Sequence, residues 1–147
     1  MKIEIVQATL QDIEKLSILF DNYRIFYKQT SDIKLAKAFL IDRISNHESV
    51  IFVAKDESTP LGFTQLFPSF SSVSTSHTWM LNDLYVLPEY QNLGIGSMLL
   101  YHAQQHAKRT LAKGIFLQTA KTNTGAQSLY ESNGYCKLPY LGYFLTL

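Results

Sequence analysis

The segment Gln91-Asn92-Leu93-Gly94-Ile95-Gly96-Ser97 lies between an expected strand closed by Pro88 and an expected helix over residues 96–109. Two glycines here allow the backbone to adopt positive φ and to come close to a ligand. The helix start then presents free N–H groups and the positive end of the helix dipole, which together attract anions. The segment therefore predicts a site for a phosphate-bearing ligand, without saying which one.

Two common phosphate-binding loops do not fit this segment. A Walker-type loop ends in Gly-Lys-Ser/Thr, whereas Ser97-Met98 follows Gly96 here. A dinucleotide-binding fingerprint needs a third glycine, and Leu99 stands at that position. Taken alone, Gly94 and Gly96 are as typical of an ordinary turn as of a ligand loop, so the surrounding sequence has to decide between them.

Outward from this segment, the spacing of apolar residues predicts strands and helices in mixed order. Strands are expected over residues 3–7, 50–54, 61–67, 79–87, 115–119, 135–138 and 141–147, and helices over residues 13–23, 31–46, 96–109 and 123–134. A serine-rich loop is expected over residues 69–76, either as a solvated hairpin tip or as the rim of a substrate site. Antiparallel strands come first and strand–helix–strand units follow, so we expect one α/β domain over residues 1–147 with a mixed sheet.

Composition excludes several classes of protein. The 147 residues include 13 Lys and Arg against 12 Asp and Glu, and this net charge of +1 argues against a nucleic-acid binder. No apolar run approaches the length of a membrane span, and the N-terminus lacks a signal-like stretch, so we expect a cytoplasmic protein with no membrane partner. The lone Cys136 cannot form an internal disulfide and is expected in the core.

The run from Leu81 to Gly96 resembles the acetyl-CoA-binding core of the GNAT family of N-acetyltransferases. The family pattern, Gln/Arg-x-x-Gly-x-Gly/Ala after a strand with a Val-x-Pro-like end, is matched by Gln91, Gly94 and Gly96. Residues 123–135 resemble a second family element, Asn-x-x-Ala-x-x-Leu-Tyr-x-x-x-Gly-Phe/Tyr. Two motifs in the right order are more specific than either one. The resemblance implies the GNAT fold: an α/β fold with a mixed, mostly antiparallel central sheet of about seven strands flanked by about four helices.

The same resemblance implies acetyl-CoA as cosubstrate and no metal. In the family, the loop amides hold the CoA pyrophosphate, and pantetheine pairs as an extra strand with a bulged strand that is splayed from its neighbour. The splayed neighbour here is expected to be the strand over residues 115–119. The implied cofactor-binding residues of this chain are Leu84, Tyr85, Val86, Gln91, Asn92, Leu93, Gly94, Ile95, Gly96, Ser97, Asn123 and Tyr130.

The implied reaction is direct attack of a primary amine on the acetyl thioester. The amine must be neutral, and because lysine-like amines have a pKa of about 10.4, a base is useful. Asp83 is the candidate base, because its apolar neighbours argue for burial and burial raises the pKa of a carboxylate. An ordered water as base, or a purely structural carboxylate, are the alternatives. Tyr130 matches the family tyrosine that protonates the departing thiolate; its alternative role is core packing.

Acceptor-side residues are less defined by the sequence. Tyr23, Phe26 and Tyr27 give the expected first helix an aromatic end, which is either core packing or a wall of the acceptor site. His77 is the histidine expected to contact substrate. His102 and His106 share a helix face but lack the glutamate of a zinc-protease motif between them, so no metal site is expected.

Three classes of function stay open at this point. The leading hypothesis is an N-acetyltransferase acting on a small-molecule amine or polyamine, for which Asp21, Asp32 and Asp83 would supply acidic groups. A lysine or an N-terminus of a protein or peptide is the alternative acceptor. A non-catalytic acyl-CoA-binding module and another kind of nucleotide-binding domain are the other hypotheses.

The apolar closing segment, residues 140–147, predicts an inner strand or a homodimer interface.

Overall fold

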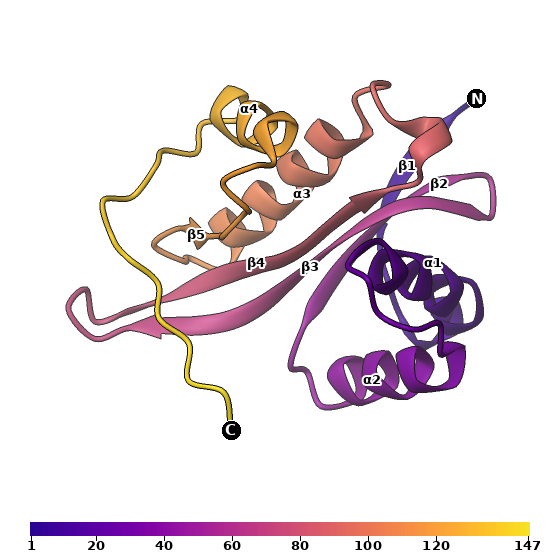
Figure 1. Cartoon of the computed structure of the whole chain (residues 1–147), viewed down its shortest axis with the longest axis horizontal. Coiled ribbons are helices and arrows are strands. Elements are labelled where there is room, and N and C mark those ends of the chain that lie inside the picture. Colours follow the sequence, from indigo (N-terminus) through magenta and orange to yellow (C-terminus); the bar gives the residue numbers. More distant parts are fainter.

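Five strands form one sheet in the order β1-β2-β3-β4-β5 in the computed structural model, which describes all residues 1–147. The first four strands are successively antiparallel, and β5 joins the edge of β4 in parallel. This arrangement confirms the expected mixed, mostly antiparallel α/β sheet (Figure 1). The strands are β1 (Ile3–Gln7), β2 (Val50–Asp56), β3 (Thr59–Ser71), β4 (Ser76–Val86) and β5 (Ile115–Phe116).

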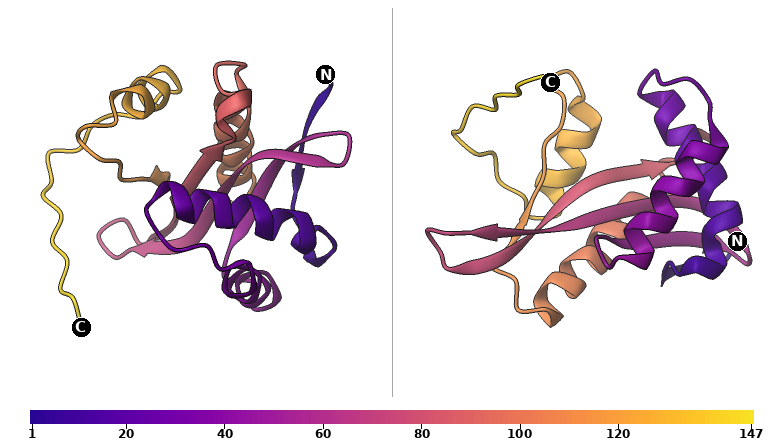
Figure 2. Two further views of the ribbon diagram at one scale, coloured as in Figure 1. Left: turned by 45° about the vertical axis from the view of Figure 1, so that its right-hand side comes forward. Right: turned by 90° about the horizontal axis from the view of Figure 1, so that it is seen from below.

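Helices cover both faces of this sheet. The helices α1 and α2 lie on one face, and α3 and α4 lie on the other (Figures 1 and 2). Thr9 and Asp12 form a capping box before α1, and the Asp32 side chain accepts the amide of Leu35 to begin α2. Their bounds are α1 (Ile13–Phe26), α2 (Ile33–Ser45), α3 (Ile95–Arg109) and α4 (Thr124–Ser132), with short 3-10 helices at Leu10–Asp12 and Pro88–Tyr90.

Two hydrophobic clusters follow from this layering. One joins the sheet to α3 through residues such as Leu66, Leu81 and Leu99. The other joins the opposite face to α1 and α2 through residues such as Leu16 and Phe63. Successive side chains of a strand point to opposite faces, so the sheet contributes to both clusters at once.

A bulge interrupts the alternation of β4. Gln65 of β3 pairs with Asp83, but Leu66 pairs with Leu81, which leaves Asn82 as an extra residue in β4. Leu81 and Leu84 both pack toward α3 although they are three residues apart, and Asp83 points toward α1 and α2 instead. The bulge therefore places Asn82 and Asp83 on the same side of the sheet, so that the carboxylate lies outside the apolar α3 cluster.

The expectation of about seven strands is wrong, because the sheet has five. Residues 135–147 follow α4 without strand pairing, and Tyr143 and Phe144 are each 91% exposed. A strand needs an edge to pair with, and β5, which would provide it, extends over only two residues instead of the expected 115–119. The chain after α4 runs away from the sheet (Figure 2). A role of residues 140–147 in a homodimer stays a prediction.

Other expectations also need correction. Strands β3 and β4 continue through the serine-rich segment as far as a turn at residues 72–75, so the expected loop is the tip of a long hairpin. The backbone passes Pro68 without a break in pairing to Trp79. Cys136 is exposed and not part of the core, because the segment that carries it does not return to the sheet. None of the helices combines the length and the apolarity that a membrane crossing requires.

Candidate active site

The loop before α3 presents a row of free backbone amides. Asn92 and Gly94 both have positive φ, 62° and 82°, which folds the loop tightly ahead of the helix. The amides of residues 92–97 donate no hydrogen bond to any other atom of the protein, and no side chain caps the helix start. Such amides at the positive end of a 15-residue helix form an anion site. The geometry suits the phosphate ligand that the sequence predicts.

The two sequence motifs meet in space at this loop. A Cβ atom on Gly96 would lie 2.9 Å from Cδ2 of Leu129, so glycine permits the close packing of α3 against α4. The Asn133 side chain donates to the Ser97 hydroxyl at 3.2 Å, which joins the end of α4 to the start of α3. The Gln91 side chain donates to the carbonyl of Val86 at 3.1 Å and joins the loop to the end of β4.

The edge of β4 beside this loop has no strand partner. β5 pairs only with Trp79 and Met80, so residues 81–86 of β4 are splayed from it, as expected for a bulged strand. The amide of Leu87 donates to Leu61 of β3. In an antiparallel pair, the N–H and C=O groups of successive residues point alternately to the two sides of the strand. Those of Tyr85 therefore point toward β3, and those of Leu84 and Val86 point toward the open edge. Of the three residues expected to pair with pantetheine, Leu84 and Val86 thus have backbone groups that face the open edge, and Tyr85 does not.

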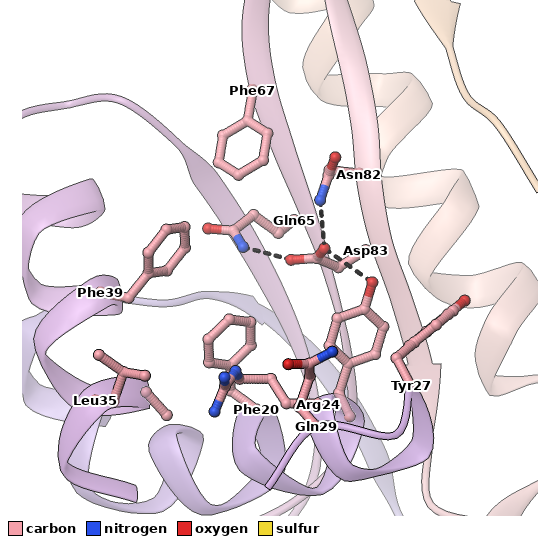
Figure 3. Close-up of a pocket in the computed structure, with 12 residues that line it drawn as sticks. Phe20, Arg24, Tyr27, Gln29, Leu35, Phe39, Gln65, Phe67, Asn82 and Asp83 are labelled. Carbon is pink, nitrogen blue, oxygen red and sulfur yellow. Dashed lines mark hydrogen bonds between the residues drawn. The ribbon is translucent and has the colours of Figure 1, made fainter. Parts of the chain in front are cut away.

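Asp83 is a buried carboxylate held by three donors. Its Oδ1 accepts the hydroxyl of Tyr23 at 3.0 Å and the side-chain amide of Asn82 at 2.7 Å, and its Oδ2 accepts the side-chain amide of Gln65. Figure 3 shows these bonds converging on the carboxylate. Burial raises the pKa of Asp83, and the three hydrogen bonds offset this only in part. A carboxylate with a raised pKa is a better proton acceptor than an exposed one.

Asp83 forms part of the wall of a cavity of about 440 Å³ between the sheet and the helices α1 and α2. Apolar and aromatic side chains dominate the wall, and the polar groups are few, as is typical of small-molecule sites. The lining residues are Phe20, Tyr23, Arg24, Tyr27, Gln29, Leu35, Ala36, Phe39, Gln65, Phe67, Asn82 and Asp83.

Phenols connect this cavity to α4. The rings of Tyr23 and Tyr27 are 5.0 Å apart, and Tyr27 lies close enough to Tyr130 to contribute to the raised pKa of the Tyr130 phenol. The pKa of Tyr130 lies above its ordinary value, mainly because the side chain is buried. Burial and the neighbouring Asp83 carboxylate likewise raise the pKa of Tyr23. Tyr130 therefore keeps its proton over the physiological range.

Other residues predicted from the sequence lie elsewhere. Phe26 is exposed and does not line the cavity, although its ring lies 5.2 Å from that of Tyr27. His77 lies in the long hairpin, where its Nε2 atom is 2.6 Å from the carbonyl oxygen of Thr110 at the end of α3. It also does not line the cavity. Asn123 caps α4 by accepting the amide of Ala126 at 3.1 Å, a structural role that explains its place in the motif.

Two of the three acidic side chains expected to bind a polyamine instead accept hydrogen bonds within the segment that joins α1 to α2. Asp21 accepts the hydroxyl of Ser31 at 2.6 Å and the amide of Asp32 at 2.8 Å. Asp32 is occupied by the amide of Leu35 at 3.0 Å. Only Asp83 lines the cavity, whereas Arg24 adds a positive charge to it.

The sequence-based prediction did not include Gln65, Arg24 and Asn82. Gln65 is a fully buried polar residue in the run from Leu61 to Phe67, where Thr64 is the one other polar side chain, and this is a detectable signal. Asn82 and Asp83 are adjacent polar residues in an apolar strand, which indicates a break in alternation. Arg24 carries no local signal, because its place in the cavity depends on how α1 packs against α2.

No group of three or more His, Cys, Asp and Glu side chains lies close enough to hold a metal ion.

The model of the acetyltransferase (GNAT) family matches residues 15–135. The chain therefore belongs to the GNAT family, as the two motifs imply, and it is an acetyl-CoA-dependent acyltransferase of that family.

Individual relatives resemble it over almost their whole length. An uncharacterized N-acetyltransferase, YhfO, of Bacillus subtilis (strain 168) is 47% identical over 129 residues, which cover 88% of this chain and 87% of the relative. A probable acetyltransferase of Haemophilus influenzae is 32% identical over 133 residues, covering 90% of this chain and 89% of the relative. The crystal structure of a probable acetyltransferase has a TM-score of 0.92 at 40% identity and covers 98% of this chain and 97% of that chain.

Proposed function

We propose that the protein transfers acetyl from acetyl-CoA to a small primary amine that binds in the cavity beside Asp83. The observation that carries the proposal is that β4 separates two different sites. Its open edge leads to the free amides of residues 92–97, and its Asp83 side chain faces the cavity on the α1–α2 side. A thioester held along this edge lies next to an amine held by Asp83.

The residues present fit acetyl-CoA. Free amides at the start of α3 suit a pyrophosphate, because they supply donors and the helix dipole without side-chain cations. The outward backbone groups of Leu84 and Val86 suit the amide groups of pantetheine, which pair with an open sheet edge as a peptide does. Bound acetyl-CoA supplies the activated acyl group. Asn92, Leu93, Gly94, Ile95, Gly96 and Ser97 form the proposed phosphate cradle.

Asp83 is the proposed base and Tyr130 the proposed acid. Asp83 takes a proton from the acceptor ammonium, so that a neutral nitrogen faces the thioester carbon. As the carbon–nitrogen bond forms and the carbon–sulfur bond breaks, the Tyr130 hydroxyl donates its proton to the departing sulfur. The nitrogen loses a second proton to become the neutral amide, and this proton returns through water to the Tyr130 phenolate, while Asp83 releases the first proton to solvent. Burial supports both roles, since it raises the pKa of the carboxylate and keeps the phenol protonated.

The size and lining of the cavity favour a small acceptor. Its volume of about 440 Å³ lies in the range of small-molecule sites, and aromatic rings close it on several sides. A polyamine is no longer favoured, because the cavity holds one carboxylate and one guanidinium instead of several acids. A lysine or an N-terminus of a peptide remains the alternative acceptor.

Release of free CoA thiol tests this function. The protein is mixed with acetyl-CoA and a panel of polyamines, amino acids, aminoglycosides and short peptides, and thiol release is followed against a protein-free control. We expect release that depends on both protein and amine. If the protein binds acetyl-CoA by calorimetry but releases thiol with none of these amines, it is a binding module and the proposal fails.

A further inference from the structure

Two polar groups in the acceptor cavity have no partner within the protein. Arg24, in the last turn of α1, lines the cavity, and its buried Nη1 atom donates no hydrogen bond. Gln65 is fully buried, and its Oε1 atom accepts none. Its Nε2 atom is already committed to Asp83, so the amide cannot be turned around without losing that bond. Figure 3 shows the free oxygen of Gln65 directed away from Asp83, toward Phe39.

Leaving these two polar groups without hydrogen-bond partners costs free energy unless a bound ligand supplies the missing partners. Buried polar atoms in proteins are almost always hydrogen-bonded. Gln65 is fully buried, and the Nη1 atom of Arg24 is buried although its side chain as a whole is only partly so. Gln65 Oε1 needs a hydrogen-bond donor, and the guanidinium of Arg24 needs an anion with carboxylate or phosphate geometry. Both groups line the same cavity, so one ligand can satisfy both.

The protein itself does not supply the anion for Arg24. Asp21, one turn before it on α1, is held by Ser31 and by the amide of Asp32. No ion pair within 4.0 Å joins Arg24 to any carboxylate, Asp83 included. The positive and the negative group of the cavity are therefore separated and face different parts of whatever binds between them.

We propose that the acceptor is a small primary amine that also carries a carboxylate, so an amino-acid-like molecule with an apolar body. This inference rests on the proposed acetyl transfer and names its substrate class. The ammonium donates to Asp83 and to Gln65 Oε1, and the carboxylate accepts from Arg24. The apolar body packs against rings such as Phe20 and Phe39, which stack 5.7 Å apart. A diamine of the same length would bring a second cation against Arg24, where like charges repel.

Matched acceptors test the proposal in thiol-release assays. One pair is 6-aminohexanoate and 1,6-diaminohexane, which differ only in the far end, and the other is phenylalanine and phenylalaninamide. A charge-assisted hydrogen bond to Arg24 is expected to raise kcat/KM for the carboxylate member of at least one pair by about tenfold or more. Calorimetric binding of the same four compounds gives a readout that does not depend on turnover.

Substitution of Arg24 identifies the group responsible. Arg24→Gln is expected to abolish the preference for the carboxylate by reducing kcat/KM for that acceptor only, and Arg24→Met replaces it if the glutamine variant does not fold. Arg109→Gln at the end of α3 is the matched control, because α3 lies on the opposite face of the sheet (Figure 1) and Arg109 does not line the cavity. It is expected to keep the preference of the parent protein.

The outcomes separate this inference from the proposed function. If the parent protein prefers the carboxylate in neither pair, or if the preference survives in the Arg24 variant, the substrate class is wrong although acetyl transfer stands. If no amine of any kind releases thiol, the proposed function itself fails. A preference that is present in the parent protein and lost only with Arg24 supports the assignment.

Discussion

Asp83→Asn removes the proposed base while it keeps the shape of the side chain. Positioned general bases contribute about 10²- to 10⁴-fold to rate, which corresponds to about 2.7–5.5 kcal/mol in the activation free energy. We therefore expect kcat to fall by this factor. The Kd for acetyl-CoA should stay unchanged, because Asp83 faces the cavity and not the amides of residues 92–97.

The pH profile distinguishes a base from a merely structural residue. Activity of the parent protein should rise as Asp83 loses its proton, with a midpoint above the ordinary value of 3.8 because burial raises the pKa of this carboxylate. This acidic limb should be absent from Asp83→Asn. The same acceptor is used for both proteins, so that titration of the amine itself affects both profiles alike.

Folding of the variant has to be measured separately. Three donors converge on the Asp83 carboxylate, and the amide group of asparagine leaves at least one of them unpaired, at a cost of about 1–3 kcal/mol. Urea unfolding reports this change. The control is Asp56→Asn, the same substitution at a carboxylate that accepts the amide of Lys2 far from the cavity. An Asp83→Asn protein that keeps both full turnover and the acidic limb would refute the assignment.

Three further substitutions test the rest of the site. Tyr130→Phe should lower turnover by about tenfold or more while acetyl-CoA binding is retained. In the parent protein, the decline of activity at high pH should lie above pH 10, because burial raises the pKa of the Tyr130 phenol. Full turnover in the variant would contradict the role of Tyr130 as the acid. Gly94→Ala should cost about 1–2 kcal/mol in unfolding free energy and weaken acetyl-CoA binding, because alanine is strained at a φ of 82°. Gly62→Ala should cost about 1–3 kcal/mol, since its Cβ atom would lie 2.7 Å from the carbonyl oxygen of Tyr85. Gly125→Ala, which enters open space, is the control for both, and equal unfolding midpoints for all three would rule out the steric argument.

Local signals made the loop before α3 predictable from the sequence, while its binding of the cofactor stays a prediction. Gly94, Gly96 and the helix start they precede form a continuous segment, so its backbone geometry depends on few distant contacts. The burial of Asp83 was also predictable from its apolar neighbours, while its role as base stays a prediction. The four helices follow from apolar spacing and from caps such as Thr9 and Asp32.

The acceptor side and the end of the chain depend on tertiary contacts that the sequence does not show. Arg24 and Gln65 are ordinary residues of a helix and a strand until the packing of α1 and α2 encloses them in one cavity. The apolar composition of residues 140–147 predicted an inner strand or a homodimer interface, but apolarity indicates only that burial against some partner is favourable. Pairing also needs an available edge, and the two residues of β5 do not provide one.

The bulge at Asn82 divides β4 into two parts with opposite alternation of side chains. Up to Leu81, side chains are assigned to the two faces by one parity of residue number, and from Asp83 onward by the other. If β4 ran on from Leu81 in strict alternation, with Asn82 present but no bulge, the carboxylate would face the apolar α3 cluster and Leu84 would face the acceptor cavity. The chemistry of this site therefore depends on where β4 bulges as much as on which residues it contains.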